Sequence, residues 1–120
     1  MKISIVGGTG GMGEGFALRW VVNHDITIGS RDAQKAASAA EQYMNTALSS
    51  YGNNMKGTIK GADYVSSSRD SDILILSIPY ESIKLTCDSI SNSIKDGCII
   101  VSPIVPMERN DFGFTYIPFD

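Results

Sequence analysis

A glycine-rich segment near the amino terminus constrains the fold more than any other feature of this sequence. It follows a short β-branched run, Ile3 to Val6, and precedes residues with helical spacing. We interpret Gly8 as the tight turn out of a strand, Gly10 as the closest approach of a pyrophosphate, and Gly13 as a helix–strand contact. The whole segment consists of Gly7, Gly8, Thr9, Gly10, Gly11, Met12 and Gly13.

Strand-like apolar runs alternate with segments of helical spacing along the whole chain. Residues 73–78 and 98–102 are apolar without alternation, which predicts parallel strands buried on both faces. Residues 104–120 carry two prolines and are predicted to be irregular. The order of elements predicts an α/β fold, a doubly wound parallel sheet (Rossmann fold) in three αβα layers. The predicted strands are 3–6, 26–28, 58–60, 73–78 and 98–102, and the predicted helices are 11–23, 33–49 (with Asp32 as N-cap), 62–69 and 80–94.

Ligands of doubly wound sheets bind beyond the carboxyl ends of the strands. In this sequence, glycines, prolines and hydroxyl side chains follow four of the five predicted strands, so we expect them to collect on one rim. Together with the glycine segment, the candidate binding residues on this rim are Ser30, Arg31, Lys35, Ser77, Ile78, Pro79, Ser102, Pro103 and Val105.

The residues after the second predicted strand indicate which dinucleotide is bound. Folds that bind NAD usually place Asp or Glu here to hold the ribose 2′-hydroxyl. This chain instead has Ser30 and Arg31, with Lys35 one turn into the next helix. These side chains would bind a 2′-phosphate that a carboxylate would repel. Two charged hydrogen bonds would favour NADP over NAD by roughly 10²–10⁴-fold.

Composition excludes several other classes of protein. The 120 residues permit one domain, and a formal charge of −3 without a basic stripe argues against nucleic-acid binding. No apolar run is long enough to cross a membrane, and no signal peptide is expected before the first strand. Cys87 and Cys98 lack CxxC spacing and are interpreted as reduced, buried thiols of a cytoplasmic protein. A metal site is not expected, because His24 is the single histidine and is predicted to lie in a surface turn.

Two further patterns are interpreted as structural. Tyr80 and Lys84 have the Y-x-x-x-K spacing of short-chain dehydrogenases, but they follow the fourth predicted strand directly and are expected to start a helix near the cofactor. Met12, Phe16 and Trp20 have helical spacing and are expected to pack in the core, with Met12 also touching the cofactor. No side chain is therefore assigned a catalytic role.

Several loops, taken in order, resemble the archaeal and bacterial NADPH:F-420 oxidoreductases (F420-dependent NADP reductases). The resemblance covers essentially the whole chain, and the loops agree in order and spacing. They are the glycine segment, Gly29-Ser30-Arg31 with Lys35, Ser77-Ile78-Pro79-Tyr80-Glu81, Val101-Ser102-Pro103-Ile104-Val105-Pro106, and Gly113-Phe114-Thr115-Tyr116.

The resemblance implies reversible hydride transfer between NADP(H) and the deazaflavin coenzyme F420. The cofactors carry the chemistry, and the protein orients them and excludes water. It also implies that Thr9 to Met12 wrap the pyrophosphate and that Ser30, Arg31 and Lys35 hold the 2′-phosphate. Ile78 and Pro79 would line the ribose and nicotinamide, and Ser102 to Val105 would flank the nicotinamide and the deazaflavin.

Members of the family carry a helical C-terminal domain that closes the cleft, supplies much of the deazaflavin site and makes a homodimer. The 120 residues are therefore expected to be the NADP-binding domain alone, from a longer protein or a truncated relative. Two alternatives stay open at this point: a module that binds NADP without catalysis, and an NADPH-dependent reductase of another acceptor, such as an imine, a flavin or a ferric chelate.

Overall fold

The computed structural model describes residues 1–103, 107–110 and 113–116, with side chains described for residues 1–103. The strands are β1 (Lys2–Val6), β2 (Asp25–Ser30), β3 (Ile59–Asp63), β4 (Ile73–Leu76), β5 (Ile99–Val101), β6 (Met107–Asn110) and β7 (Gly113–Tyr116). The helices are α1 (Gly11–Trp20), α2 (Ala33–Tyr51), α3 (Tyr64–Ser68) and α4 (Ile83–Ile90), with short 3₁₀ turns η1 (Gly52–Asn54) and η2 (Tyr80–Ser82).

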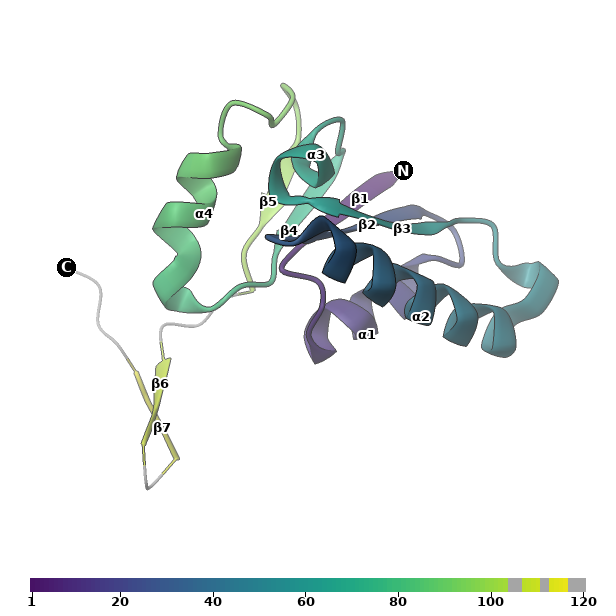
Figure 1. The fold of residues 1–120 in the computed structure, drawn as a ribbon, viewed down its shortest axis with the longest axis horizontal. Helices are drawn as coiled ribbons and strands as arrows, with labels where there is room; N and C mark the ends of the chain where they lie inside the picture. Colours follow the sequence, from purple (N-terminus) through teal and green to yellow (C-terminus); the bar gives the residue numbers. More distant parts are fainter. Residues whose placement is uncertain (104–106, 111–112, 117–120) are drawn as a thin grey trace.

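Five parallel strands form one sheet in the order β3-β2-β1-β4-β5, which confirms the predicted doubly wound α/β fold. The strand order reverses beside β1, where β2 lies on one side and β4 on the other. Figure 1 shows α1 and α2 together on one side of the sheet, with α3 and α4 away from them. In a sheet of this order, the crevice beyond the carboxyl end of β1 is the expected place for a ligand.

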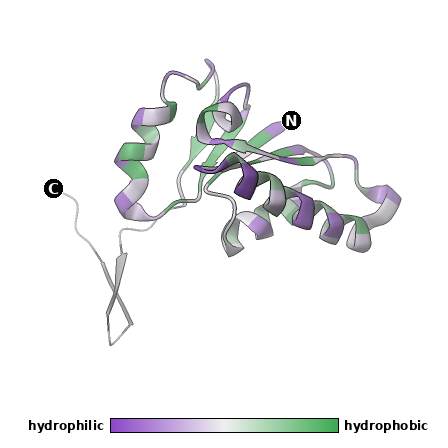
Figure 2. Ribbon diagram, in the orientation of Figure 1, coloured by the Kyte–Doolittle hydropathy of each residue, from purple (hydrophilic) through white to green (hydrophobic). Residues whose placement is uncertain are grey.

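Two hydrophobic clusters hold the helices against the sheet. Ile3, Ile26 and Ile59 belong to a cluster that also contains buried residues of α1 and α2. On the opposite face, Leu74 packs with Ile90 of α4. Figure 2 shows the hydrophobic colour concentrated in the central strands, while α2 carries hydrophilic residues along its length. Because each cluster fixes a different pair of helices, the loops at the carboxyl ends of the strands have rigid supports on both sides.

The predicted N-cap of α2 is confirmed. Asp32 has an extended backbone, and its carboxylate accepts hydrogen bonds from the backbone amides of Gln34 (2.9 Å) and Lys35 (3.4 Å). The predicted apolar face of the fourth helix is also confirmed, since Ile83, Cys87, Ile90 and Ile94 all pack in or against one cluster. The helix itself is shorter than predicted, because residues 80–82 form a 3₁₀ turn and Ser91 is the C-cap.

The predicted burial of the last strand of the sheet is wrong. Ile99, Ile100 and Val101 are 60%, 51% and 42% exposed. Apolar sequence predicted the strand itself correctly, but burial also requires helices on both faces. Strand β5 is the edge of the sheet, and no helix follows it in the described part of the chain.

The prediction of an irregular tail is wrong for the residues that the structure describes. Strands β6 and β7 pair antiparallel, from Met107 opposite Tyr116 to Asn110 opposite Gly113. The paired residues 107–110 and 113–116 contain no proline, so each of them has an amide that can donate a hydrogen bond.

Within the described ranges, no helix is both long and apolar enough to cross a membrane.

Candidate functional site

The glycine segment connects β1 to α1 and is held closely against β2. The carbonyl oxygen of Gly29 accepts hydrogen bonds from the amides of Gly7 (2.9 Å) and Gly8 (3.2 Å). Gly7 has a φ of +81°, a conformation that glycine adopts without steric cost. The turn therefore places the start of α1 at the reversal of strand order, as the sequence predicted for a dinucleotide site.

Two of the glycines in this segment are required by packing within the protein. A Cβ atom on Gly13 would lie 2.5 Å from the Cα atom of Gly8, so α1 approaches the turn too closely for any side chain. A Cβ atom on Gly7 would collide with the backbone of Ser77 and with Ile78. The first observation fits the predicted role of Gly13 as the point where the helix packs closely against the end of the strand.

Gly10 and Gly11 have no such internal reason to be glycine. A Cβ atom on either residue would meet nothing within 4 Å. Gly10 is the N-cap of α1 and has no side chain with which to satisfy the first amides of the helix. These amides and the positive end of the helix dipole therefore border open space, an arrangement that suits an anion such as a pyrophosphate.

The sequence did not predict that Tyr43 supports this turn through a hydrogen bond. Tyr43 of α2 is buried, and its hydroxyl donates a 3.0 Å hydrogen bond to the carbonyl oxygen of Gly8. Burial raises the pKa of the Tyr43 phenol, with a smaller contribution from the negative charge of Glu14. The phenol thus stays protonated and available as a donor. The partners lie 35 positions apart, so no local pattern could have predicted this contact.

Ser30 ends β2, and the two cations Arg31 and Lys35 follow it in the chain. Ser30 is buried, and its hydroxyl accepts a 3.4 Å hydrogen bond from the amide of Asp32. Arg31 and Lys35 are exposed, and within the described residues neither forms an ion pair. The carboxylate of Asp32 accepts hydrogen bonds from backbone amides as the N-cap of α2, and within the described residues it forms no ion pair with either cation.

Each of the two cations borders a different hollow. Lys35 lines a hollow of about 470 Å³ together with Thr9 of the glycine segment and residues of α2. Arg31 lines a cleft of about 440 Å³ between α3 and α4, whose walls include Val65 and Leu85. Leu85 is 76% exposed, a large apolar side chain left open to solvent on the wall of this cleft. No local sequence pattern predicted this cleft, because its walls come from two helices on either side of β4.

Three of the predicted site residues follow β4 beside the glycine turn. The amide of Ser77 donates a 2.8 Å hydrogen bond to the carbonyl oxygen of Val6, which extends the pairing of β1 with β4. Ile78 is buried in the cluster beneath α4, and Pro79 is exposed. The backbone of Ser77 therefore lies against Gly7, at the same rim as the turn.

Of the remaining predicted site residues, the structure describes Ser102 and Pro103. Ser102 and Pro103 follow β5 at the carboxyl edge of the sheet, and Ser102 is exposed. Val105 lies outside the described residues. Met12 is 53% exposed on the first turn of α1 and is not part of the core, contrary to one prediction.

The histidine and the two cysteines considered in the sequence analysis do not line the nucleotide rim. His24 lies in a turn before β2 as predicted, although it is partly buried and its Nδ1 atom has no hydrogen-bond partner among the described residues. Cys87 and Cys98 are free and half-buried. Burial raises the pKa of the Cys98 thiol. No group of three or more His, Cys, Asp or Glu residues in the described part of the chain could hold a metal ion.

The fold and the rim together define an α/β domain of the dinucleotide-binding type. Residues 2–106 match the family model described as "NADP oxidoreductase coenzyme F420-dependent". The chain belongs to this family.

Curated relatives agree with the family match. The chain is 35% identical over 109 residues to the F420-dependent NADP reductase of Methanothermobacter marburgensis, and 39% identical over 107 residues to that of Methanocaldococcus jannaschii. These alignments cover 90% and 89% of this chain but 46% of each relative. The chain thus spans about half the length of the curated relatives it matches.

Solved structures share the fold at lower identity. A candidate F420-dependent NADP reductase from Arthrobacter sp. FB24 superposes with a TM-score of 0.72 at 20% identity, covering 100% of this chain and 53% of that one. The lactate dehydrogenase MGS-M5 from a deep-sea metagenome gives 0.70 at 22% identity, covering 89% and 38%. At these identities the structures establish the Rossmann-like fold and leave the ligand to be argued from the residues.

Proposed function

We propose that the rim around the glycine segment binds NADP(H), with the pyrophosphate at the amino terminus of α1. The observation that carries this proposal is the open space at Gly10 and Gly11 beside a helix without an N-cap side chain. Thr9, Gly10, Gly11 and Met12 would surround the pyrophosphate, and Gly8 and Gly13 would keep the turn tight enough for its approach.

The 2′-phosphate is proposed to lie over Ser30, between Arg31 and Lys35. Both cations are exposed and lack an ion-pair partner in the described part of the chain, so a dianionic phosphate would not have to displace a carboxylate. The capping role of Asp32 supports this assignment, because its carboxylate is bonded to backbone amides and to neither cation. Arginine can meet a phosphate through two parallel hydrogen bonds, whereas lysine adds a point charge.

The adenine base is proposed to enter the cleft beside Arg31. Val65 and Leu85 provide apolar walls there, and the guanidinium group of Arg31 stands at the same cleft. A planar aromatic base can pack between such walls and stack on the guanidinium group. This arrangement would also account for the exposure of Leu85, which nothing in the described chain covers.

The proposed activity is hydride transfer between NADP(H) and the deazaflavin coenzyme F420. When bound, the nicotinamide supplies a carbon that gives or accepts hydride, so the chain needs no nucleophile of its own. Its residues would orient the ring and exclude water: Ser77, Ile78 and Pro79 on one side, and Ser102, Pro103 and Val105 on the other. The relatives named for this activity are about twice as long, so turnover by these 120 residues is a separate question from binding.

The test mixes the chain with NADPH and F420 and follows the deazaflavin absorbance. A change that depends on both compounds supports the reductase. Binding of NADPH without turnover would leave a nucleotide-binding module, and turnover with a flavin, an imine or a ferric chelate in place of F420 would identify a different acceptor. Absence of NADPH binding would contradict the proposal altogether.

A further inference from the structure

A third hollow lies on the face of the sheet that carries α3, away from the glycine turn. It has a volume of about 400 Å³ and extends over β1, β2 and β3. Its lining includes residues at the amino ends of these strands, such as Lys2, Asp25 and Thr58. Since the strands are parallel, their amino ends lie at the edge opposite the nucleotide rim. We call this hollow the polar groove.

The floor of the polar groove is a row of polar side chains on three adjacent strands. Ser4 is paired in register with Thr27, and Thr27 with Lys60. The row on the other face of the same strands, Ile3, Ile26 and Ile59, is buried under α1 and α2. A parallel sheet covered on both faces would be apolar on both. Here the crossover helix α3 has five residues, which is too short to cover these strands along their whole length.

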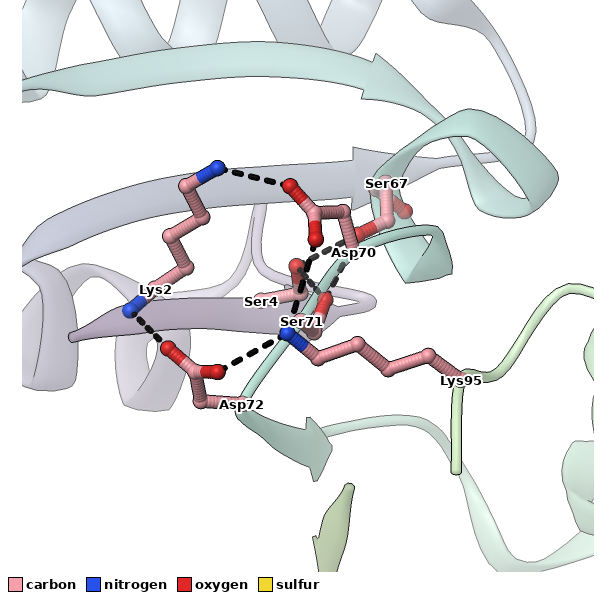
Figure 3. Close-up of polar contacts among 7 residues, drawn as sticks. All are labelled: Lys2, Ser4, Ser67, Asp70, Ser71, Asp72 and Lys95. Carbon is pink, nitrogen blue, oxygen red and sulfur yellow. Dashed lines mark hydrogen bonds and ion pairs between the residues drawn. The ribbon is translucent and has the colours of Figure 1, made fainter. Parts of the chain in front are cut away.

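One wall of the polar groove is a cluster of neutralised charges, shown in Figure 3. The Nζ atom of Lys2 lies 2.6 Å from Asp70, and Lys95 contacts both Asp72 (2.9 Å) and Asp70 (3.4 Å). Beneath them, the hydroxyl of Ser4 donates to the carbonyl oxygen of Ser67. This network fixes the loop before β4, and its two lysines and two aspartates balance.

The remaining charges in the groove do not balance. Asp25 accepts hydrogen bonds from the amide and hydroxyl of Thr58, both 3.2 Å long. Lys60 on the floor and Arg69 on the wall form no ion pair or hydrogen bond with any described residue. Hydrogen bonds from Ser66 lower the pKa of Asp63, and the charge of Arg69 adds a smaller effect. Two uncommitted cations thus line one concave surface in a chain whose formal charge is −3.

We propose that the polar groove binds a small anion bearing phosphate or carboxylate groups, between Lys60 and Arg69. The hydroxyl group of Thr27, which lines the same hollow, is a further donor. This site is distinct from the nucleotide rim, because its lining shares none of the residues assigned to NADP(H). Phosphate and carboxylate present the same recognition chemistry to Lys and Arg.

The experiment titrates the ¹⁵N-labelled chain with inorganic phosphate, with citrate, and with sodium chloride at matched ionic strength. Backbone amide shifts of Thr27 and Gly61 report on the groove, and those of Gly10 and Gly11 report on the nucleotide rim. Lys60→Gln and Arg69→Gln are the test variants, and Lys56→Gln, an exposed lysine outside the groove, is the matched control. The same samples are titrated with NADPH.

We expect saturable shifts at Thr27 and Gly61 with phosphate, citrate or both, and the stronger of the two identifies the anion class. Each test variant should weaken this binding by about two- to fivefold, and Lys56→Gln should leave it unchanged. Both variants should bind NADPH like the unmodified chain. Shifts that grow linearly and equal those in sodium chloride, or saturable shifts that the test variants do not weaken, would overturn the proposal. Failure of NADPH binding with saturable groove shifts would overturn the nucleotide assignment and leave the groove in place.

Discussion

The hydroxyl of Tyr43 donates a hydrogen bond of 3.0 Å to the carbonyl oxygen of Gly8, which links the middle of α2 to the turn after β1. Gly8 is also bonded through its amide to the carbonyl oxygen of Gly29 at the end of β2. The turn is thus fixed from both sides before any ligand arrives. A preformed turn holds the amides of α1 in position for a pyrophosphate without an ordering cost on binding.

Tyr43→Phe should therefore weaken both the fold and the site. It removes a buried hydrogen bond and leaves the Gly8 carbonyl without that partner, which costs about 1 kcal/mol of the free energy of unfolding. Urea denaturation measures this loss, and calorimetry should show weaker NADPH binding. Tyr51→Phe on the same helix is the control, because the Tyr51 hydroxyl forms no hydrogen bond with the described residues. Equal effects of the two substitutions would contradict a specific role for Tyr43.

Alanine at Gly11 and at Gly13 should have opposite effects on stability. A Cβ atom at Gly11 meets open space, so Gly11→Ala should keep or raise stability, by up to about 1 kcal/mol. The same methyl group occupies the space assigned to the pyrophosphate and should reduce NADPH affinity. Gly13→Ala should destabilise the fold by about 1–3 kcal/mol, because its Cβ atom would overlap Gly8. Thermal unfolding and NADPH titration of both variants separate the two roles, and unchanged NADPH binding by Gly11→Ala would place the pyrophosphate elsewhere.

Arg31→Ala should discriminate between the two dinucleotides. Loss of a charged hydrogen bond to the 2′-phosphate should weaken NADPH binding by about tenfold or more, with a smaller effect on NADH, which lacks that phosphate. Fluorescence titration with each nucleotide measures the ratio. Arg19→Ala removes an exposed arginine from the last turn of α1 and serves as the control for net charge. If Arg31→Ala lowers both affinities equally, the 2′-phosphate is not held by Arg31.

The charge cluster at the amino ends of β1 and β4 predicts a pH dependence of stability. A hydrogen bond from the Lys2 amide, followed by one from the Lys95 side chain, lowers the pKa of Asp72 below its usual 3.8. A carboxyl group whose pKa falls on folding contributes stability above its unfolded pKa and loses it as pH drops through the folded value. Asp72→Asn should therefore reduce the free energy of unfolding at pH 7 and have little effect well below pH 3.8. Urea denaturation across this range measures the difference, and a constant difference at all pH values would contradict it.

Local sequence patterns predicted the parts of this fold that depend on neighbouring residues. The glycine turn, the Asp32 cap and the apolar face of α4 each arise within a few positions of the chain, and the structure confirms them. The alternation of strands and helices was sufficient to predict a parallel doubly wound sheet. These features are set by backbone sterics, capping and amphipathic spacing, which short windows of sequence contain.

What the sequence could not predict depends on tertiary placement. The apolar run of β5 predicted a strand but not its exposure, because burial is decided by which helices cover the edge of the sheet. The bond from Tyr43 to Gly8 and the cleft shared by Arg31 and Leu85 join segments far apart in the chain. The polar groove follows from strand register combined with the shortness of α3, and neither is visible in a single segment.

The central claim is that this rim recognises a dinucleotide by the phosphate on its adenosine ribose. Calorimetric titration of the unmodified chain with NADPH and with NADH, at the same ionic strength, tests it most directly. We expect NADPH to bind more tightly than NADH by roughly a hundredfold or more. Equal affinity for the two nucleotides, or no binding of either, would contradict it.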